Sequence, residues 1–230
     1  MATKGGLNVV TDGLVLALDA ANPKSYPGSG TTWKDLTRFT DGSLVNGPTY
    51  SSDKGGNIIF DGTNDYCQVT SDGFGRFNSQ TFTVEAWVNP DSNNADQCIF
   101  SYDYTSHVQP YYSTHLRLST LGRIYLLWNN GSSYRSIVTD FSFAYSINEW
   151  QHIAAVYTSG RQEIIHNGVL IKSGTATDTI TFYNQEVWVG RGNFASGYFD
   201  GKIASVKHYT EALSLEQIQQ NYNATKQRFK

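Results

Sequence analysis

Apolar and polar residues alternate over short stretches along much of this chain, the period-2 pattern of strands that lie in a sheet. The clearest stretch is 81–88, where one alternating set is apolar throughout. Phe82, Val84, Ala86 and Val88 point to one side of this strand, and we expect Phe82, Val84 and Ala86 to be buried. In the stretch 150–157 both alternating sets are largely apolar, and they include Ile153 and Ala155. We therefore expect 150–157 to be a central strand.

Two pairs of strands are expected to form hairpins. Asn167-Gly168 lies between 161–166 and 169–171 and supplies the positive φ angles of a two-residue type I′ turn. Stretches 58–60 and 66–69 flank a polar turn and are predicted to pair as the second hairpin.

One short helix is predicted near the end of the chain. Ser214 followed by Gln217 forms a capping box, and Leu213 and Ile218 have the spacing of a hydrophobic staple. Leu215, Ile218 and Tyr222 share one face, so we expect the helix to dock on a sheet.

Composition narrows the class of protein. The chain has 230 residues, which suits one all-β sandwich, and 14 % of them are aromatic, with 15 Tyr. The formal net charge is −3, from 17 basic and 20 acidic residues without long runs, so we expect no nucleic-acid partner. No apolar run is long enough to span a bilayer, so we expect no membrane insertion. Cys67 and Cys98 lie in separate predicted strands and are expected to be buried free thiols, with a single bridge as the alternative.

Several phrases resemble the laminin-G-like branch of the concanavalin A-like lectins and glucanases. They are Val84-Glu85-Ala86-Trp87-Val88, Trp150-Gln151-His152-Ile153-Ala154 and Phe199-Asp200-Gly201-Lys202-Ile203, together with Phe60-Asp61-Gly62 and Ala212-Leu213-Ser214. The resemblance implies an all-β, two-sheet antiparallel jelly-roll sandwich with one short C-terminal helix. We expect an N-terminal arm (1–12), the LamG-like jelly-roll domain (13–225) and a loose C-terminal tail (226–230). The arm could either anchor the domain to a partner or pack along its own edge strand.

Stretches 11–20, 25–33 and 223–229 are similar to jelly-roll proteins encoded among tailed-bacteriophage structural genes. This resemblance implies a virion structural or decoration protein, with capsid or tail proteins as partners and adhesion as its work. Residues 1–6 lack the apolar core of a signal peptide, so we expect synthesis in the host cytosol followed by assembly into the virion. The alternatives are a free-standing carbohydrate-binding lectin and a glycoside hydrolase with an unrecognised site.

The sequence predicts no enzyme. A glycosidase needs two carboxyl groups on one cleft, and the related glucanases carry theirs on one strand at a Glu-x-Asp spacing that this chain lacks. Glu85, Glu163 and Glu186 stand alone in sequence, and we interpret Glu85 as a hydrogen-bonded structural carboxylate. No catalytic residue is therefore assigned.

No metal or other cofactor is expected. The resemblance implies a Ca²⁺ site with an aspartate in the strand after Gly201-Lys202-Ile203, but Ala204 stands where that aspartate would be. Asp61 and Asp65 are weak candidate ligands, and the preferred interpretation is that they only form an Asx turn.

Aromatic residues and amides concentrate in two predicted loops. Aromatic rings stack on the apolar faces of sugars while amides fix their orientation, so this composition indicates a glycan-binding patch. Loop tyrosines also serve protein contacts, and the pattern fits both. The candidate ligand-binding residues are Tyr102, Tyr104, His107, Tyr111, Tyr112, Trp128, Asn129, Asn130 and Tyr134.

Overall fold

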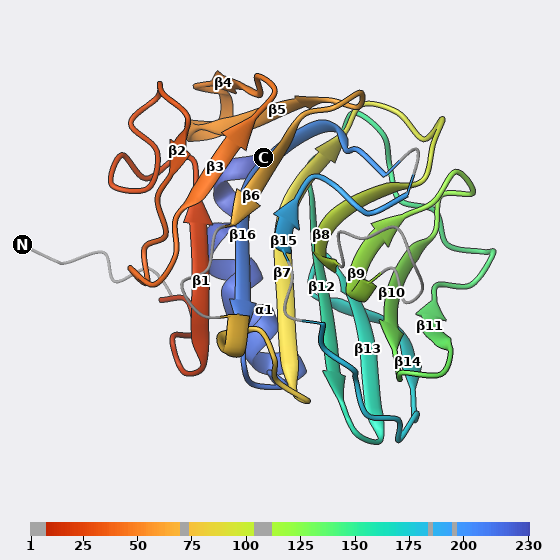
Figure 1. Cartoon of the computed structure of the whole chain (residues 1–230). Helices are drawn as coiled ribbons and strands as arrows, with labels where there is room; N and C mark the ends of the chain where they lie inside the picture. The colour runs from red at the N-terminus through yellow and green to blue at the C-terminus, as the bar shows by residue number, and fades with distance from the viewer. Residues whose placement is uncertain (1–7, 70–73, 104–111, 184–185, 195–196) are drawn as a thin grey trace, which may run out of the picture.

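The computed structural model describes residues 8–69, 74–103, 112–183, 186–194 and 197–230. Within these ranges the chain forms two eight-stranded antiparallel sheets, called A and B below, that face each other across one core. Figure 1 shows sheet B in front of sheet A, with helix α1 (Leu215–Thr225) behind both. The all-β sandwich predicted from the sequence is confirmed.

Sheet A has the strand order β14-β13-β12-β7-β16-β5-β4, and β1 pairs with β16 beside this path. Its strands are β1 (Leu14–Asp19), β4 (Thr49–Ser51), β5 (Asn57–Asp61), β7 (Phe82–Pro90), β12 (Gln151–Thr158), β13 (Arg161–His166), β14 (Val169–Gly174) and β16 (Asp200–Tyr209).

Sheet B has the order β11-β10-β9-β8-β15-β6-β3-β2. Its strands are β2 (Thr32–Trp33), β3 (Gly42–Val45), β6 (Tyr66–Val69), β8 (Gln97–Asp103), β9 (Tyr112–Leu118), β10 (Ile124–Asn129), β11 (Tyr134–Val138) and β15 (Glu186–Val189). Three short 3₁₀ helices complete the described elements: η1 (Asp53–Gly55), η2 (Phe74–Arg76) and η3 (Lys226–Phe229).

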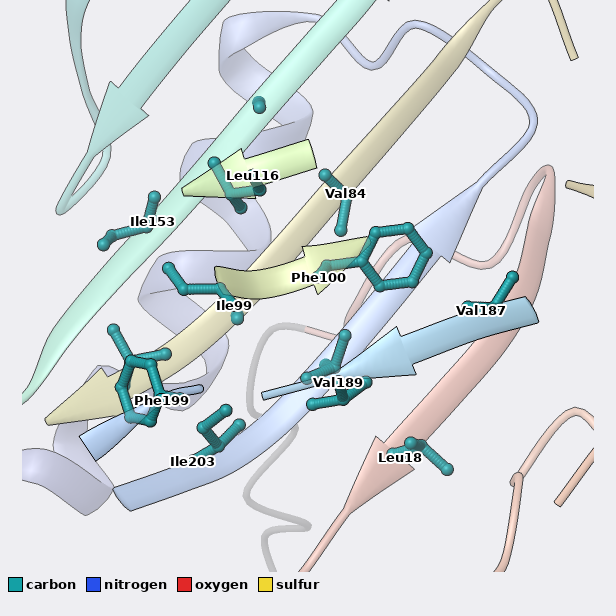
Figure 2. Close-up of a cluster of buried hydrophobic side chains, with 14 of the residues drawn as sticks. Leu18, Val84, Ile99, Phe100, Leu116, Ile153, Val187, Val189, Phe199 and Ile203 are labelled. Carbon is teal, nitrogen blue, oxygen red and sulfur yellow. The ribbon is translucent and has the colours of Figure 1, made fainter. Parts of the chain in front are cut away.

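The core lies between the inner faces of the two sheets. Figure 2 shows Val84 and Ile153 from sheet A meeting Ile99 and Leu116 from sheet B. The predicted strands at 81–88 and 150–157 are confirmed as β7 and β12, which pair directly, with Ile153 opposite Ala86. The side chains predicted to be buried are all in the core: Phe82, Val84, Ala86, Ile153 and Ala155. Strand β12 lies between β7 and β13, so its prediction as a central strand is also confirmed.

The two predicted hairpins have opposite outcomes. Asn167 and Gly168 have φ angles of 51° and 78° and join β13 to β14, as a type I′ turn requires. The second hairpin is wrong, because β5 belongs to sheet A and β6 to sheet B. The polar turn 61–65 therefore crosses from one sheet to the other.

Helix α1 covers the outer face of sheet A. The capping box predicted at its start is present, because the Ser214 hydroxyl accepts from the Gln217 amide and the Gln217 side chain accepts from the Ser214 amide. Leu213 and Ile218 are buried in one cluster with Val156 and Ile165, as the predicted staple requires.

A buried polar network lies between α1 and sheet A. The Lys207 ammonium donates to Glu85 at 2.8 Å, and the Asn221 amide donates to the other Glu85 oxygen at 3.2 Å. Burial acts to raise the pKa of Glu85, but the charge of Lys207 and the nearby His152 outweigh it and lower this pKa to about 2. Glu85 is thus a structural carboxylate, as predicted.

Both ends of the described chain pack on the sandwich. Val10 is buried, and its amide donates to Asn221 at 2.7 Å, so this part of the predicted arm packs on its own domain. Residues 226–230 were expected to be loose, which is wrong: they include η3, and the Phe229 ring stacks on Trp87 at 4.1 Å. The Phe229 ring packs on Trp87 of sheet A, a contact that the local sequence does not indicate.

The two cysteines are free and buried, which confirms the expectation for Cys67 and Cys98. Burial raises the pKa of both thiols, which makes them poor nucleophiles. Among the described helices, none combines the length and the apolar composition needed to cross a bilayer.

Candidate functional site

Aromatic rings from strands distant in sequence meet on the outer face of sheet B. Tyr134 on β11 stacks on Tyr112 of β9 with ring centroids 4.8 Å apart, and Tyr112 lies 4.0 Å from the His115 ring. A β-bulge between Tyr102 and Asp103 brings Asp103 opposite Tyr112, which places Tyr112 on this outer face.

A second group of rings lies further across the same face. The Arg191 guanidinium lies 3.8 Å from the ring centre of Trp188 on β15 and 4.6 Å from that of Tyr66 on β6. The Trp188 indole donates to Glu186 at 2.7 Å. Arg191 has no ion-pair partner among the described residues. Within that part of the chain its guanidinium is stabilised by cation–π contacts with the rings.

The segment that carries Arg191 and Phe194 is fixed to the sheet by buried polar groups. The Ser101 hydroxyl donates to the Arg191 carbonyl oxygen at 2.8 Å, and Asp103 accepts from the Asn193 amide at 3.0 Å. The other Asp103 oxygen lies 2.5 Å from His115 Nε2. Phe194, three residues after Arg191, lies 6.0 Å from the His115 ring. Together the two groups of rings form the aromatic surface, defined by Tyr66, Tyr112, Tyr134, Trp188, Arg191 and Phe194, in which Trp188 is buried beneath Arg191.

Two carboxylates face each other across this surface. Glu186 on β15 is the direct register partner of Asp103 on β8, and both lie on the outer face. Cross-strand partners have Cβ atoms about 5 Å apart, which is similar to the separation of the two catalytic carboxyl groups of a retaining glycosidase. Asp103 is fully buried, however, and both of its oxygens hold hydrogen bonds within the protein. Glu186 stands alone in the sequence, and the pairing of β15 with β8 brings a second carboxylate opposite it.

The residues predicted from sequence separate into three groups. Tyr112 and Tyr134 are brought together on the aromatic surface, and Tyr134 keeps 36 % of its area exposed. Tyr104, His107 and Tyr111 lie outside the described residues.

Four other predicted residues serve the fold. Tyr102 and Trp128 point into the core with 1 % exposure each, so these two predictions are corrected: neither ring is open to a ligand. The Tyr102 hydroxyl donates to Asn78 at 2.7 Å. Asn129 is buried and accepts from the Gly131 amide, while Asn130 accepts from the Ser132 and Ser133 amides in the same turn.

Sequence analysis missed the half of the surface formed by Tyr66, Trp188 and Arg191. A usable signal was present, because Trp188 lies between Val187 and Val189, which both face the core. A residue between two core residues of a strand must point outward. The alternation does not indicate which outward-facing residues on different strands become neighbours.

The candidate metal ligands hold the turn between the sheets. One Asp61 oxygen accepts from the backbone amides of Thr63, Asn64 and Asp65. These amides lower the pKa of Asp61 against the opposing effect of desolvation. Asp65 is buried, and desolvation followed by the charge of Asp61 raises its pKa. Among the described residues no group of three or more His, Cys, Asp or Glu is placed to hold a metal ion.

The carbonyl of Ala204, where the resemblance placed an aspartate, accepts from the Ala20 amide at 2.9 Å. The carboxylate at the end of β1 is bound by the guanidinium of Arg228. Arg228 donates to Asp19 at 2.8 Å and to the carbonyl oxygens of Lys54 and Gly56.

Comparison with protein families agrees with this architecture. Residues 61–219, more than half of the chain, match the family described as the concanavalin A-like lectin/glucanases superfamily. The chain belongs to this family. No curated protein matches it in sequence.

Solved structures with a similar fold include a domain of an arabinanase and structures of botulinum neurotoxins. Domain 4 of AbnA, an extracellular arabinanase from Geobacillus stearothermophilus solved with arabinotriose, is 19 % identical with a TM-score of 0.68, covering 90 % of this chain and 96 % of that one. The receptor-binding domain of botulinum neurotoxin type G is 16 % identical with a TM-score of 0.68 over 92 % of this chain. A structure of botulinum neurotoxin type C, whose cell entry is described as dependent on two ganglioside molecules, is 15 % identical with a TM-score of 0.71 over 93 %. The chain spans about half the length of these toxin structures, 51 % in each case.

Proposed function

We propose that this chain is a non-enzymatic glycan-binding module that contacts sugars through the aromatic surface. The observation that carries the proposal is the Tyr134–Tyr112 stack on the outer face of sheet B, on the same face as the Arg191 guanidinium, which covers the buried ring of Trp188. Ring faces suit the apolar faces of sugar rings, and the guanidinium supplies hydrogen-bond donors at a fixed position. The glycan contacts of AbnA domain 4 and of botulinum neurotoxin type C support a sugar ligand for this fold.

The rigidity of the surface also favours binding. Ser101 and Asp103 hold the segment with Arg191 and Phe194 against the sheet, so a ligand would not have to order it. Sites whose rings are already positioned lose less conformational entropy when a ligand binds.

The proposed setting is a tailed-phage virion, where the module would attach to capsid or tail proteins and act in adhesion. The support for this setting is the similarity of stretches 11–20, 25–33 and 223–229 to phage structural proteins. On a virion, many copies would convert weak sugar contacts into firm attachment through effective concentration. Locating the chain in a reconstruction of the particle tests this part of the proposal.

The Glu186–Asp103 register pair favours glycoside hydrolysis as the second candidate function. It ranks below binding because a buried carboxylate with two internal hydrogen bonds is poorly placed to attack a sugar or to protonate a leaving group. Hydrolysis of an oligosaccharide that is lost in Glu186→Gln, with the fold intact, would establish the hydrolase instead.

A glycan array of bacterial surface and plant cell-wall oligosaccharides, including arabinotriose, tests the proposed binding. We expect at least one glycan to bind and Tyr134→Ala to weaken it about tenfold, the equivalent of about 1.4 kcal/mol. Phe141→Ala is the matched control, because Phe141 is 82 % exposed and outside the aromatic surface. Equal losses in both variants, or no binding to any glycan, would contradict the proposal.

A further inference from the structure

A cavity of about 590 Å³ lies on the outer face of sheet A, the side of the sandwich away from the aromatic surface. Its floor is formed by the adjacent strands β1 and β16, and its walls include residues from the N-terminal segment, the segment 36–39 and the end of α1. In Figure 1 these parts meet around β1, beside α1. The volume is within the range of about 300–1,000 Å³ that small-molecule sites occupy.

The floor carries polar groups in a fixed register. Ser205 is the cross-strand partner of Asp19, and Lys207 lies two residues further along β16 on the same face. Ser205 is only 5 % exposed, and its hydroxyl has no hydrogen-bond partner within the described part of the chain. A hydroxyl that lines a cavity and makes no hydrogen bond within the protein is available to a ligand.

The charges on the floor and rim cancel. Lys207 is paired with Glu85 at 2.8 Å, and Arg228 is paired with Asp19 at 2.8 Å. Neither cation is left for an anionic ligand, and neither carboxylate for a cationic one. The ammonium still has two further N–H donors, and the Asp19 carboxylate has further lone pairs. The cavity therefore offers donors and acceptors without net charge.

One wall of the cavity carries two large apolar side chains and is held in place. Leu36 and Phe39 form one wall, and the Asp35 carboxylate anchors this segment by accepting from the amides of Ala17 at 2.8 Å and Phe39 at 3.1 Å. An apolar wall over a polar floor without net charge suits a molecule with one apolar face and several hydroxyl groups. A fatty acid would leave the floor groups unpaired, which disfavours it.

We propose that this cavity binds a neutral saccharide unit, with Ser205, Lys207 and Asp19 contacting its hydroxyl groups. The site is separate from the aromatic surface and does not depend on the function proposed for that surface. With both sites occupied, the module would hold two glycans on opposite sides of the sandwich.

The test is an NMR titration of the ¹⁵N-labelled full chain with glucose, galactose, mannose, arabinose and N-acetylglucosamine. Glucuronate and decanoate are the charged and lipid comparisons. We expect saturable amide shifts at Ser205 and Leu36 with at least one neutral sugar at millimolar concentration. Shifts there with decanoate or glucuronate alone, or with no sugar at all, would overturn the proposal.

Two variants make the test specific to the cavity. Ser205→Val replaces the hydroxyl with two methyl groups, which removes its hydrogen bonds and narrows the cavity, and we expect at least about tenfold weaker binding. Ala17→Met fills the floor and should abolish binding, while Ser173→Val on β14 is the matched control. Thermal melts establish that each variant is folded, and parent-like binding by folded Ser205→Val and Ala17→Met would overturn the assignment.

The two proposals can fail separately. Tyr134→Ala should leave the cavity shifts unchanged, and Ser205→Val should leave array binding by the aromatic surface unchanged. A loss of cavity binding in Tyr134→Ala would place the sugar on the aromatic surface and would overturn the second site.

Discussion

Arg228 on η3 donates to the carboxylate of Asp19 on β1 at 2.8 Å, across 209 positions of the chain. The same guanidinium binds the carbonyl oxygens of Lys54 and Gly56, so one side chain joins three segments. This contact fastens the last described helix to the edge of sheet A and forms part of the wall of the cavity.

Removing that guanidinium should therefore destabilise the domain. Arg228→Ala is expected to lower the free energy of unfolding by about 2 kcal/mol, because charged hydrogen bonds to partly buried acceptors are lost together. Urea denaturation measures the change. Arg135→Ala is the control, since Arg135 is half exposed and 3.5 Å from Asp178, and its loss should stay within about 0.5 kcal/mol. Equal midpoints for Arg228→Ala and the parent would contradict this account.

Chelation should leave the melting temperature unchanged. Asp61 already accepts from three backbone amides, and Arg228 already binds the oxygens at the end of β1. A ligand that binds only the folded state raises the melting temperature, and its removal must lower it. The measurement is a thermal melt with EDTA and with added Ca²⁺. A drop with EDTA that Ca²⁺ reverses would show a site that these contacts do not predict.

Acid should destabilise the fold, starting below pH 6.5. Desolvation lowers the pKa of His208 to about 3, and desolvation together with the charge of His152 lowers that of His166 to about 4. Both groups are neutral when folded and become protonated in the unfolded chain below their ordinary value of 6.5, so stability is full above that pH and falls below it. Between about pH 5.5 and 4.5 the two groups together give a slope of about 2.4 kcal/mol per pH unit.

Glu85 extends this loss to lower pH. Its folded pKa of about 2 lies below its ordinary 4.5, so its contribution is present above pH 4.5 and is lost as the pH falls towards 2. Urea denaturation across this range measures the profile, and His166→Gln should halve the slope above pH 4.5. A profile that stays flat from pH 6.5 to 4.5 would contradict the burial of these two histidines.

A charge at the centre of β12 should prevent folding. Ile153 is fully buried, opposite Ala86, and an unpaired buried carboxylate costs more than the stability of a typical domain. Ile153→Asp is expected to be insoluble or unfolded by circular dichroism. Ile147→Asp is the matched control, because Ile147 is 44 % exposed and should tolerate the change. Cooperative unfolding of Ile153→Asp near the parent midpoint would refute the assignment.

The sequence alone determined the features that depend on neighbours along the chain. Alternation placed Val84 and Ile153 in the core, Asn167-Gly168 formed its turn, and Ser214 with Gln217 capped α1. Each depends on backbone geometry over a few residues, which the residue types there specify directly.

Tertiary structure decided which distant residues meet. Strand order put β5 and β6 in different sheets, brought Glu186 opposite Asp103, and placed Tyr112 beside Tyr134. It also turned Trp128 into the core, where a loop site had been expected. These outcomes depend on the pairing and bulges of strands far apart in sequence, and no local pattern records a pairing partner.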